Sequence, residues 1–90
     1  MGSRVRKFDA YEIISKNIRK YRKEINMTQE ELAMKANYSH QFIRRIEAPN
    51  VKKTFSLDTV YRISKALNKD FNEMFIGLPS DDEKENDEEY

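Results

Sequence analysis

The stretch that decides the fold runs from Thr28 to Glu47 and reads TQEELAMKANYSHQFIRRIE. Thr28 and Glu31 have the spacing of a capping box, in which two side chains satisfy free amides at the start of a helix. Behind this cap, apolar residues recur at helical spacing in two successive segments. The pattern predicts one helix over residues 29–36 and a second over residues 40–47.

The turn between these two helices is Asn37-Tyr38-Ser39. A turn this short needs a residue at positive φ, and after glycine asparagine tolerates that conformation best, so Asn37 suits it. Ala33 is small enough to let the two helices cross closely. The residues expected to face the interior together are Leu32, Ala36, Tyr38, Ile43 and Ile46.

The outer face of the helix predicted over residues 40–47 is polar and carries no acid before Glu47. It is predicted to consist of His40, Gln41, Arg44 and Arg45. Arginine can bond guanine O6 and N7 with two donors, and glutamine can bond adenine in the same two-point manner. This face therefore predicts reading of base edges in double-stranded DNA, with Arg44 as the expected base contact. The sequence leaves two placements for the Phe42 side chain, either packed inward or along a sugar-phosphate edge.

Groups suited to DNA phosphates flank this face. The free amides at a helix N-terminus attract anions, and hydroxyl, amide and ammonium side chains bind phosphate oxygens. The predicted phosphate contacts are Thr28, Gln29, Lys35, Ser39, Asn50, Lys52 and Lys53.

Helical spacing continues on both sides of the central stretch. A first helix behind the Asp9-x-x-Glu12 cap has the stripe Ile14, Ile18, Tyr21 and Ile25. A fourth helix over about 57–67, with Ser56 as its cap, offers Leu57, Val60, Tyr61, Ile63 and Leu67. A short fifth helix over about 71–75, behind Asp70-x-x-Glu73, offers Phe71, Met74 and Phe75. No segment alternates like a strand, so the prediction is an all-α, five-helix domain.

The predicted organisation is a flexible segment at 1–8, a domain at 9–78 and an acidic tail at 79–90. Met1-Gly2-Ser3 is compatible with an expression-tag remnant. The net charge of +1 averages a body of +7 over residues 1–80 with −6 over residues 81–90. The tail has no apolar residue before Tyr90 and is expected to be disordered. It is interpreted either as a solubilising segment or as a competitor of DNA for the basic face.

Composition excludes several classes of protein. The absence of cysteine rules out disulfides and thiolate metal sites, and the single histidine, His40, rules out a histidine-rich metal cluster. No nucleophile-base pair or glycine-rich phosphate loop is present, so neither an enzyme nor a cofactor nor a small-molecule ligand is expected. Without a signal peptide or a membrane-length apolar run, a cytoplasmic protein is expected.

The sequence resembles the Cro/repressor-type (XRE-like) helix-turn-helix family over about residues 14–75. The resemblance rests on Ile18-Arg19-x-x-Arg22, Met27-Thr28-Gln29-Glu30-Glu31-Leu32-Ala33, Tyr38-Ser39, Ile43-x-x-Ile46-Glu47, Ser56-Leu57 and Ile63-x-x-Ala66-Leu67. It implies a compact lambda-repressor-like domain whose third helix enters the major groove. It also implies a homodimer, a two-fold operator and, most commonly, repression.

Residue roles follow from the same resemblance. Arg22 and Glu47 match a pair that forms a structural salt bridge, and Gln29 matches a residue that orients on phosphate and supports the recognition helix. The chain departs from the pattern where Asn26 and Asn37 replace common glycines, and in the loop 48–55, which lacks the usual glycine.

The subunit contact is predicted around the fifth helix, whose flank is more apolar than so short a segment needs: Phe71, Phe75, Ile76 and Leu78. A rival interpretation is a protein-interaction module, or an antitoxin-like partner protein, that retains the fold without binding DNA. Such a module would be expected to carry acidic or large apolar residues on the outer face of the 40–47 helix. The chemistry of that face favours DNA.

Overall fold

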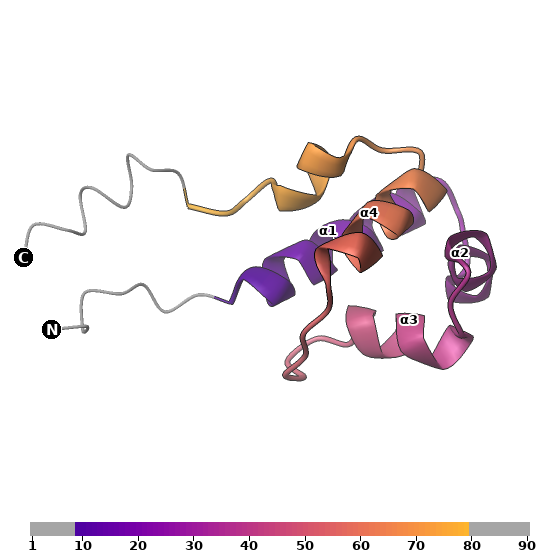
Figure 1. The fold of residues 1–90 in the computed structure, drawn as a ribbon, viewed down its shortest axis with the longest axis horizontal. Coiled ribbons are helices and arrows are strands. Elements are labelled where there is room, and N and C mark those ends of the chain that lie inside the picture. The colour runs from indigo at the N-terminus through magenta and orange to yellow at the C-terminus, as the bar shows by residue number, and fades with distance from the viewer. Residues whose placement is uncertain (1–8, 80–90) are drawn as a thin grey trace, which may run out of the picture.

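The computed structural model describes residues 9–79 (Figure 1). They form α1 (Ala10–Glu24), α2 (Gln29–Ala36), α3 (His40–Glu47), α4 (Leu57–Ala66) and the 3₁₀ helix η2 (Phe71–Phe75), and these residues contain no strand. The all-α prediction is confirmed, but the fifth helix is a single 3₁₀ segment rather than an α-helix. The predicted flexible start at 1–8 and the acidic stretch at 80–90 lie outside the described residues.

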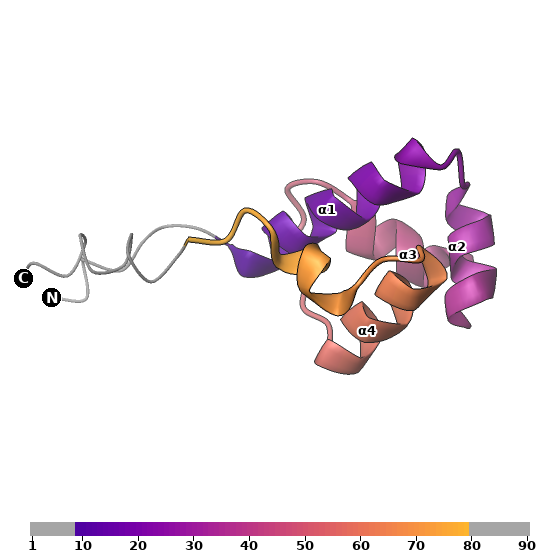
Figure 2. The same ribbon diagram turned by 90° about the horizontal axis from the view of Figure 1, so that it is seen from above.

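The helices are arranged so that α2 and α3 form one end of the domain. Figure 1 shows the beginning of α1 and the segment after η2 at the opposite end. Seen from above, η2 lies between α1 and α4 and contacts both (Figure 2). α2 packs against α3 and α4, and α1 packs against α3. Every helix therefore supports α3 directly or through one neighbour.

One apolar core joins the helices. α1 contributes Ile18, α3 contributes Ile43 and α4 contributes Ile63, and none of these three side chains reaches solvent. The other core members are Ile14, Tyr21, Leu32, Ala33, Ala36, Ile46, Val60, Leu67 and Met74. Burial of this kind contributes about 25 cal/mol per Å² of apolar surface. It fixes the inner face of α3 and leaves its other face to solvent.

The helix-turn-helix forms as the sequence predicts. Asn37 ends α2 in the left-handed region, at φ 65°. The Tyr38 amide then donates to the carbonyl of Ala33 at 2.8 Å, which closes the end of the helix. Ala33 is buried at the crossing, with 3% of its surface exposed. The predicted boundaries of α2 and α3 are confirmed.

Within residues 9–79, asparagine takes the left-handed conformation at four positions. Asn26, Asn37, Asn50 and Asn68 all have φ between 55° and 65°. Asparagine suits this region because its short polar side chain can hydrogen-bond to nearby backbone. Asn26 follows α1 and Asn68 follows α4, so three helix ends use asparagine where glycine is the usual residue.

Three residues predicted to face the core are exposed instead: Ile25 by 49%, Leu57 by 68% and Tyr61 by 50%. Ile25 is the C-cap of α1 and has left the helical backbone conformation. Leu57 and Tyr61 are one helical turn apart on α4, on a different face from the buried Val60 and Ile63. The helix therefore has a wider apolar face than the core covers.

The predicted caps are formed in part. Thr28 and Glu31 make a complete capping box, with N–O distances of 3.0 and 2.8 Å. The Asp9 carboxylate accepts from the Tyr11 amide at 2.9 Å, but Glu12 bonds Lys53 instead of completing a box. At η2, Glu73 accepts from the Asp70 amide at 3.4 Å. Ser39 and Ser56 cap α3 and α4 as predicted.

Candidate nucleic-acid interface

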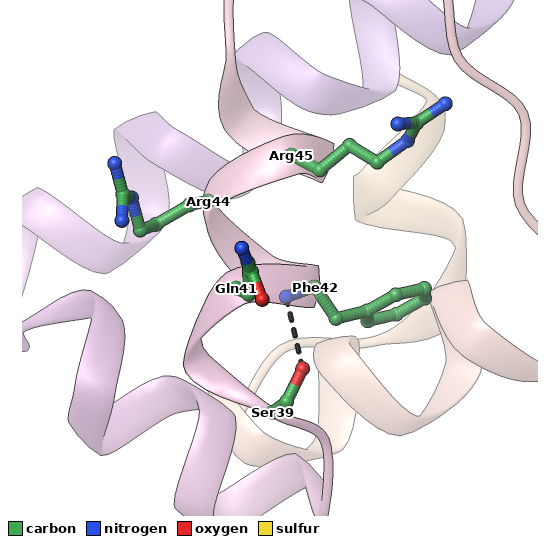
Figure 3. A pocket seen from close by; sticks show the side chains of 5 residues that line it. All are labelled: Ser39, Gln41, Phe42, Arg44 and Arg45. Atoms are coloured by element: carbon green, nitrogen blue, oxygen red, sulfur yellow. Dashed lines mark hydrogen bonds between the residues drawn. The ribbon is translucent and has the colours of Figure 1, made fainter.

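The outer face of α3 is open to solvent. His40, Gln41, Arg44 and Arg45 are all exposed, while Ile43 and Ile46 on the opposite side are buried. Figure 3 shows the guanidinium groups of Arg44 and Arg45 extending to opposite sides of the helix, with Gln41 one turn earlier. The four exposed side chains therefore present hydrogen-bond donors and acceptors to solvent, which base-edge reading requires.

A shallow, open hollow lies along this face. It is lined by Ser39, Gln41, Phe42, Arg44 and Arg45. The Ser39 hydroxyl accepts from the Phe42 amide at 3.0 Å and so caps the helix, which leaves its own proton free to donate (Figure 3). Phe42 is half-buried and its ring packs 4.6 Å from that of Tyr38. Phe42 thus contributes to both the core and the floor of the hollow.

His40 begins α3 beside α2. Its Nδ1 lies 3.5 Å from a carboxylate oxygen of Glu30, and both side chains are substantially exposed. The contact places the imidazole at the junction of the two helices, next to the N-terminus of α2. His40, at the start of α3, therefore lies beside the first turn of α2.

Only some of the backbone amides at the N-terminus of α2 are free to bind a ligand. The capping box occupies the amides of Thr28 and Glu31. The Thr28 hydroxyl accepts one of these bonds and retains a proton to donate. The capping box leaves the backbone amides of Gln29 and Glu30 free, so these two amides can bind an anion at the start of the helix.

Arg22 and Glu47 form the buried salt bridge that the resemblance implies. Two guanidinium nitrogens of Arg22 donate to the two carboxylate oxygens of Glu47 at 2.7 and 2.8 Å. The Gln29 side chain donates to the same carboxylate at 3.0 Å. Arg22 also donates to the carbonyl of Met27 at 2.7 Å. The network ties α1, the start of α2 and the end of α3 together, so Gln29 supports α3.

The salt bridge belongs to a longer polar stripe on α1 made of Glu12, Ser15, Arg19 and Arg22, which are spaced by three, four and three residues. Ser15 donates to the carbonyl of Ile46, and Arg19 donates to the carbonyl of Glu47. Carbonyls at the end of a helix lack partners within the helix. The stripe therefore satisfies the end of α3 and fixes its direction relative to α1.

The loop after α3 presents polar groups of two kinds. Asn50 and Lys52 are exposed, as a phosphate contact requires. Lys53 is buried, with 4% of its surface exposed. Its ammonium group donates to Glu12 at 2.9 Å, to the carbonyl of Ala48 at 2.7 Å and to that of Val51 at 3.0 Å. The prediction that Lys53 binds phosphate is therefore wrong, because all three of its donors are used inside the domain.

Comparison with known families gives a direct assignment. The helix-turn-helix family model HTH_3 matches residues 18–74, which span the end of the polar stripe, the tight turn and α3. The chain belongs to this helix-turn-helix family. The resemblance inferred from the sequence is thereby confirmed, and the protein is a DNA-binding transcription regulator. No curated protein sequence matches the chain.

Two solved structures share this helix-turn-helix fold. The restriction-modification controller protein C.AhdI from Aeromonas hydrophila aligns with a TM-score of 0.66 and 20% identity, covering 72% of this chain and 96% of that protein. The hypothetical transcription factor NHTF from Neisseria aligns with a TM-score of 0.68 and 20% identity, covering 82% and 80% respectively. At this identity, the likeness concerns the fold.

Of the predicted DNA-binding residues, Ser39, Gln41, Arg44 and Arg45 line the hollow along α3, whereas Lys35 does not. Lys35 lines a different hollow, between α2 and α4, with Tyr61, Arg62 and Lys65. It shares no lining residue with the hollow along α3. Asn50 and Lys52 follow the C-terminal end of α3 in the chain, and Lys52 lines a further hollow with Asp9, Ala10 and Tyr11.

The residues that sequence reasoning missed are Ser15, Arg19 and the internal role of Glu12. Their signal was a polar stripe adjacent to the apolar stripe of α1, at the same helical spacing.

Two further observations concern the described part of the chain alone. No helix within residues 9–79 is long and apolar enough to cross a membrane. Over the same residues, no three acidic or histidine side chains gather as metal ligands would.

Proposed function

We propose that the protein is a sequence-specific repressor that binds a two-fold DNA operator as a homodimer. The observation that carries this proposal is the exposure of His40, Gln41, Arg44 and Arg45 on a helix whose other face is locked into the core. Side chains on a rigid helix keep the positions that base-edge hydrogen bonds require. Repression follows the usual outcome in the family that the sequence resembles.

Phosphate contacts around α3 would hold it in the major groove. These groups are the free amides of α2, the hydroxyls of Thr28 and Ser39, and Asn50 and Lys52 in the loop that follows α3. Such contacts set the register of the protein on the duplex without selecting sequence. Lys35 stands apart from these groups, so it is assigned to an outer flank of the interface.

Lys52→Ala is expected to weaken binding to every duplex by a similar factor. Loss of one phosphate contact reduces the slope of log affinity against log salt by about one, which corresponds to about fivefold in affinity at 0.15 M salt. Fluorescence anisotropy with specific and unrelated duplexes over a salt series measures both quantities. Lys16→Ala, which removes an exposed lysine of α1, serves as the control. A loss confined to one sequence would contradict the assignment of Lys52 to phosphate.

The proposed homodimer contact uses the apolar surface formed by α4 and η2. Phe71 and Phe75 are partly buried and pack edge to face at 5.0 Å. Tyr61 extends this aromatic surface onto α4, with its ring 6.0 Å from that of Phe71. Ile76 is 60% exposed, and Leu78 is half-buried. Exposed apolar surface that gathers in one place supports a contact with another protein surface.

Ile76→Glu is expected to convert the dimer to a monomer, because a charge would be buried in the contact. Sedimentation equilibrium measures the mass, and circular dichroism checks that the helices remain. Met34→Glu is the matched control, since Met34 is 75% exposed on α2, outside the proposed contact. Equal masses for Ile76→Glu and the unchanged chain, both dimeric, would remove this surface as the subunit contact.

The proposed function is tested by selecting bound sequences from a random duplex pool. A homodimer with two copies of α3 is expected to enrich an inverted repeat whose halves lie about one helical turn, 34–36 Å, apart. An enriched single half-site would contradict the dimer alone. A pool that stays random after selection would contradict sequence-specific binding.

A further inference from the structure

Lys53 is enclosed to a degree that is unusual for a lysine. Its side chain is 2% exposed, and its ammonium group has three hydrogen-bond acceptors within 3.0 Å. A lysine ammonium has three protons, so all its donors are used. Lysine is almost never fully buried unless it is paired, because desolvation of the charge is costly. The cost is offset here by a carboxylate on α1 and two carbonyls of the loop 48–55.

These three acceptors come from two segments, one of which is distant from Lys53 in the chain. Glu12 lies in the first turn of α1, and Ala48 and Val51 lie on either side of the bend at Pro49-Asn50. Asn50 has φ 60°, which turns the chain back on itself. Lys53 therefore draws both arms of the bend to one point and fastens that point to α1.

A second contact holds the far end of the same loop. The ring of Phe55 packs edge to face against Tyr11, with centroids 4.9 Å apart. The tip of the loop, which precedes both attachments in the chain, stays outside: Asn50 and Lys52 are exposed, and Val51 is 43% exposed. A loop with a fixed base and a free polar tip is suited to presenting that tip to a partner.

We propose that Lys53 is a positioning residue for DNA, which orders the loop so that Asn50 and Lys52 reach the phosphate backbone. This inference rests on the proposed function. A loop that is already ordered does not lose conformational freedom on binding, so a larger share of each contact appears as affinity. Lys53 itself touches no phosphate and acts only through the geometry of the bend.

Lys53→Met in the full chain tests this role, because methionine keeps the length and apolar stem of lysine but has no donor. We expect affinity for a duplex to fall by about fivefold at 0.15 M salt, as for loss of the Lys52 contact. We also expect the backbone order parameters of Asn50, Val51 and Lys52 to fall from about 0.85 to below about 0.6. Affinity is measured well below the melting temperature of each variant, so that loss of stability does not enter.

A double-mutant cycle separates positioning from stability. In the unchanged chain, Lys52→Ala is expected to cost about fivefold in affinity; in the Lys53→Met background it is expected to cost less than about twofold. Additive effects would show that the Lys52 contact does not depend on Lys53 and would overturn the proposal. Unchanged order parameters in Lys53→Met would overturn it as well.

Glu12→Gln provides a second route if Lys53→Met does not fold. Glutamine keeps an oxygen acceptor for Lys53 but removes the charge, so we expect a smaller change in the same direction for loop order and affinity. No change in either would overturn the proposal. If the unchanged chain binds no duplex at all, the proposed function fails, while the order parameters still report whether Lys53 fixes the loop.

Discussion

Replacing Arg22 with alanine is expected to lower the free energy of unfolding by about 3–5 kcal/mol, the range for removing one partner of a buried ion pair. The variant leaves the carboxylate of Glu47, whose side chain is 1% exposed, without its bidentate partner. Gln29 supplies one remaining side-chain hydrogen bond, which does not neutralise the charge. Since small domains have only about 5–15 kcal/mol of stability, the variant is expected to be close to unfolding.

Urea denaturation followed by circular dichroism measures the loss. Arg62→Ala is the matched control, because Arg62 pairs with Asp58 at 3.1 Å but both side chains are about half exposed or more. An exposed pair of this spacing contributes about 0.3–0.5 kcal/mol. If the two variants lost similar stability, burial of the Arg22–Glu47 pair would not be what holds α1 to α3.

Arg44→Ala is expected to cost about 1–3 kcal/mol of binding free energy on the selected operator and to abolish preference at one base pair in each half-site. The physical reason is the loss of a bidentate contact that only guanine accepts. Arg44 is exposed and projects from α3 without contacting the core, so the melting temperature is expected to change little. Anisotropy with operator variants at each position measures the effect.

Lys52→Ala is the comparison for this variant, since it removes a positive charge without removing a base reader. The two changes are expected to differ in kind: Arg44→Ala flattens selectivity at one position, and Lys52→Ala weakens all duplexes alike. If Arg44→Ala also weakened every duplex by one factor, Arg44 would be a phosphate contact and the division of roles on α3 would be wrong.

Local patterns in the sequence were sufficient to predict the boundaries of α2 and α3. Thr28, Ser39 and Asn37 each act within a few residues of their own position, so their effect is visible without knowledge of the fold. The exposure of Leu57 and Tyr61 was not visible in this way. Helical spacing shows that α4 has a broad apolar face, but only the placement of the other helices determines how much of that face is covered.

The outer face of α3 was predictable for the same reason as its boundaries, because Ile43 and Ile46 fix which side turns inward. Lys53 was assigned incorrectly because its partner Glu12 is 41 residues away in the chain. A lysine in a polar loop is normally exposed, and only tertiary structure shows that this one is enclosed. Lys52, next to it, remains exposed.

The contacts that hold α3 against α1 were predictable only in part. Arg22 and Glu47 carry opposite charges and were inferred from a family resemblance. Ser15 and Arg19 bond to backbone carbonyls at the end of α3, which every residue possesses. The polar stripe on α1 marks these two residues as candidates, but no side-chain pattern marks a carbonyl as their partner, so the contacts themselves required the structure.

The central claim is that α3 lies in the major groove with its outer face against base edges. Titration of the isotope-labelled full chain with its selected duplex, followed by amide chemical shifts, tests it most directly. We expect the largest shifts at His40, Gln41, Arg44 and Arg45, with smaller ones at Thr28 and Lys52 and none across the α4–η2 surface. Largest shifts on α4 and η2, with α3 unchanged, would contradict the account.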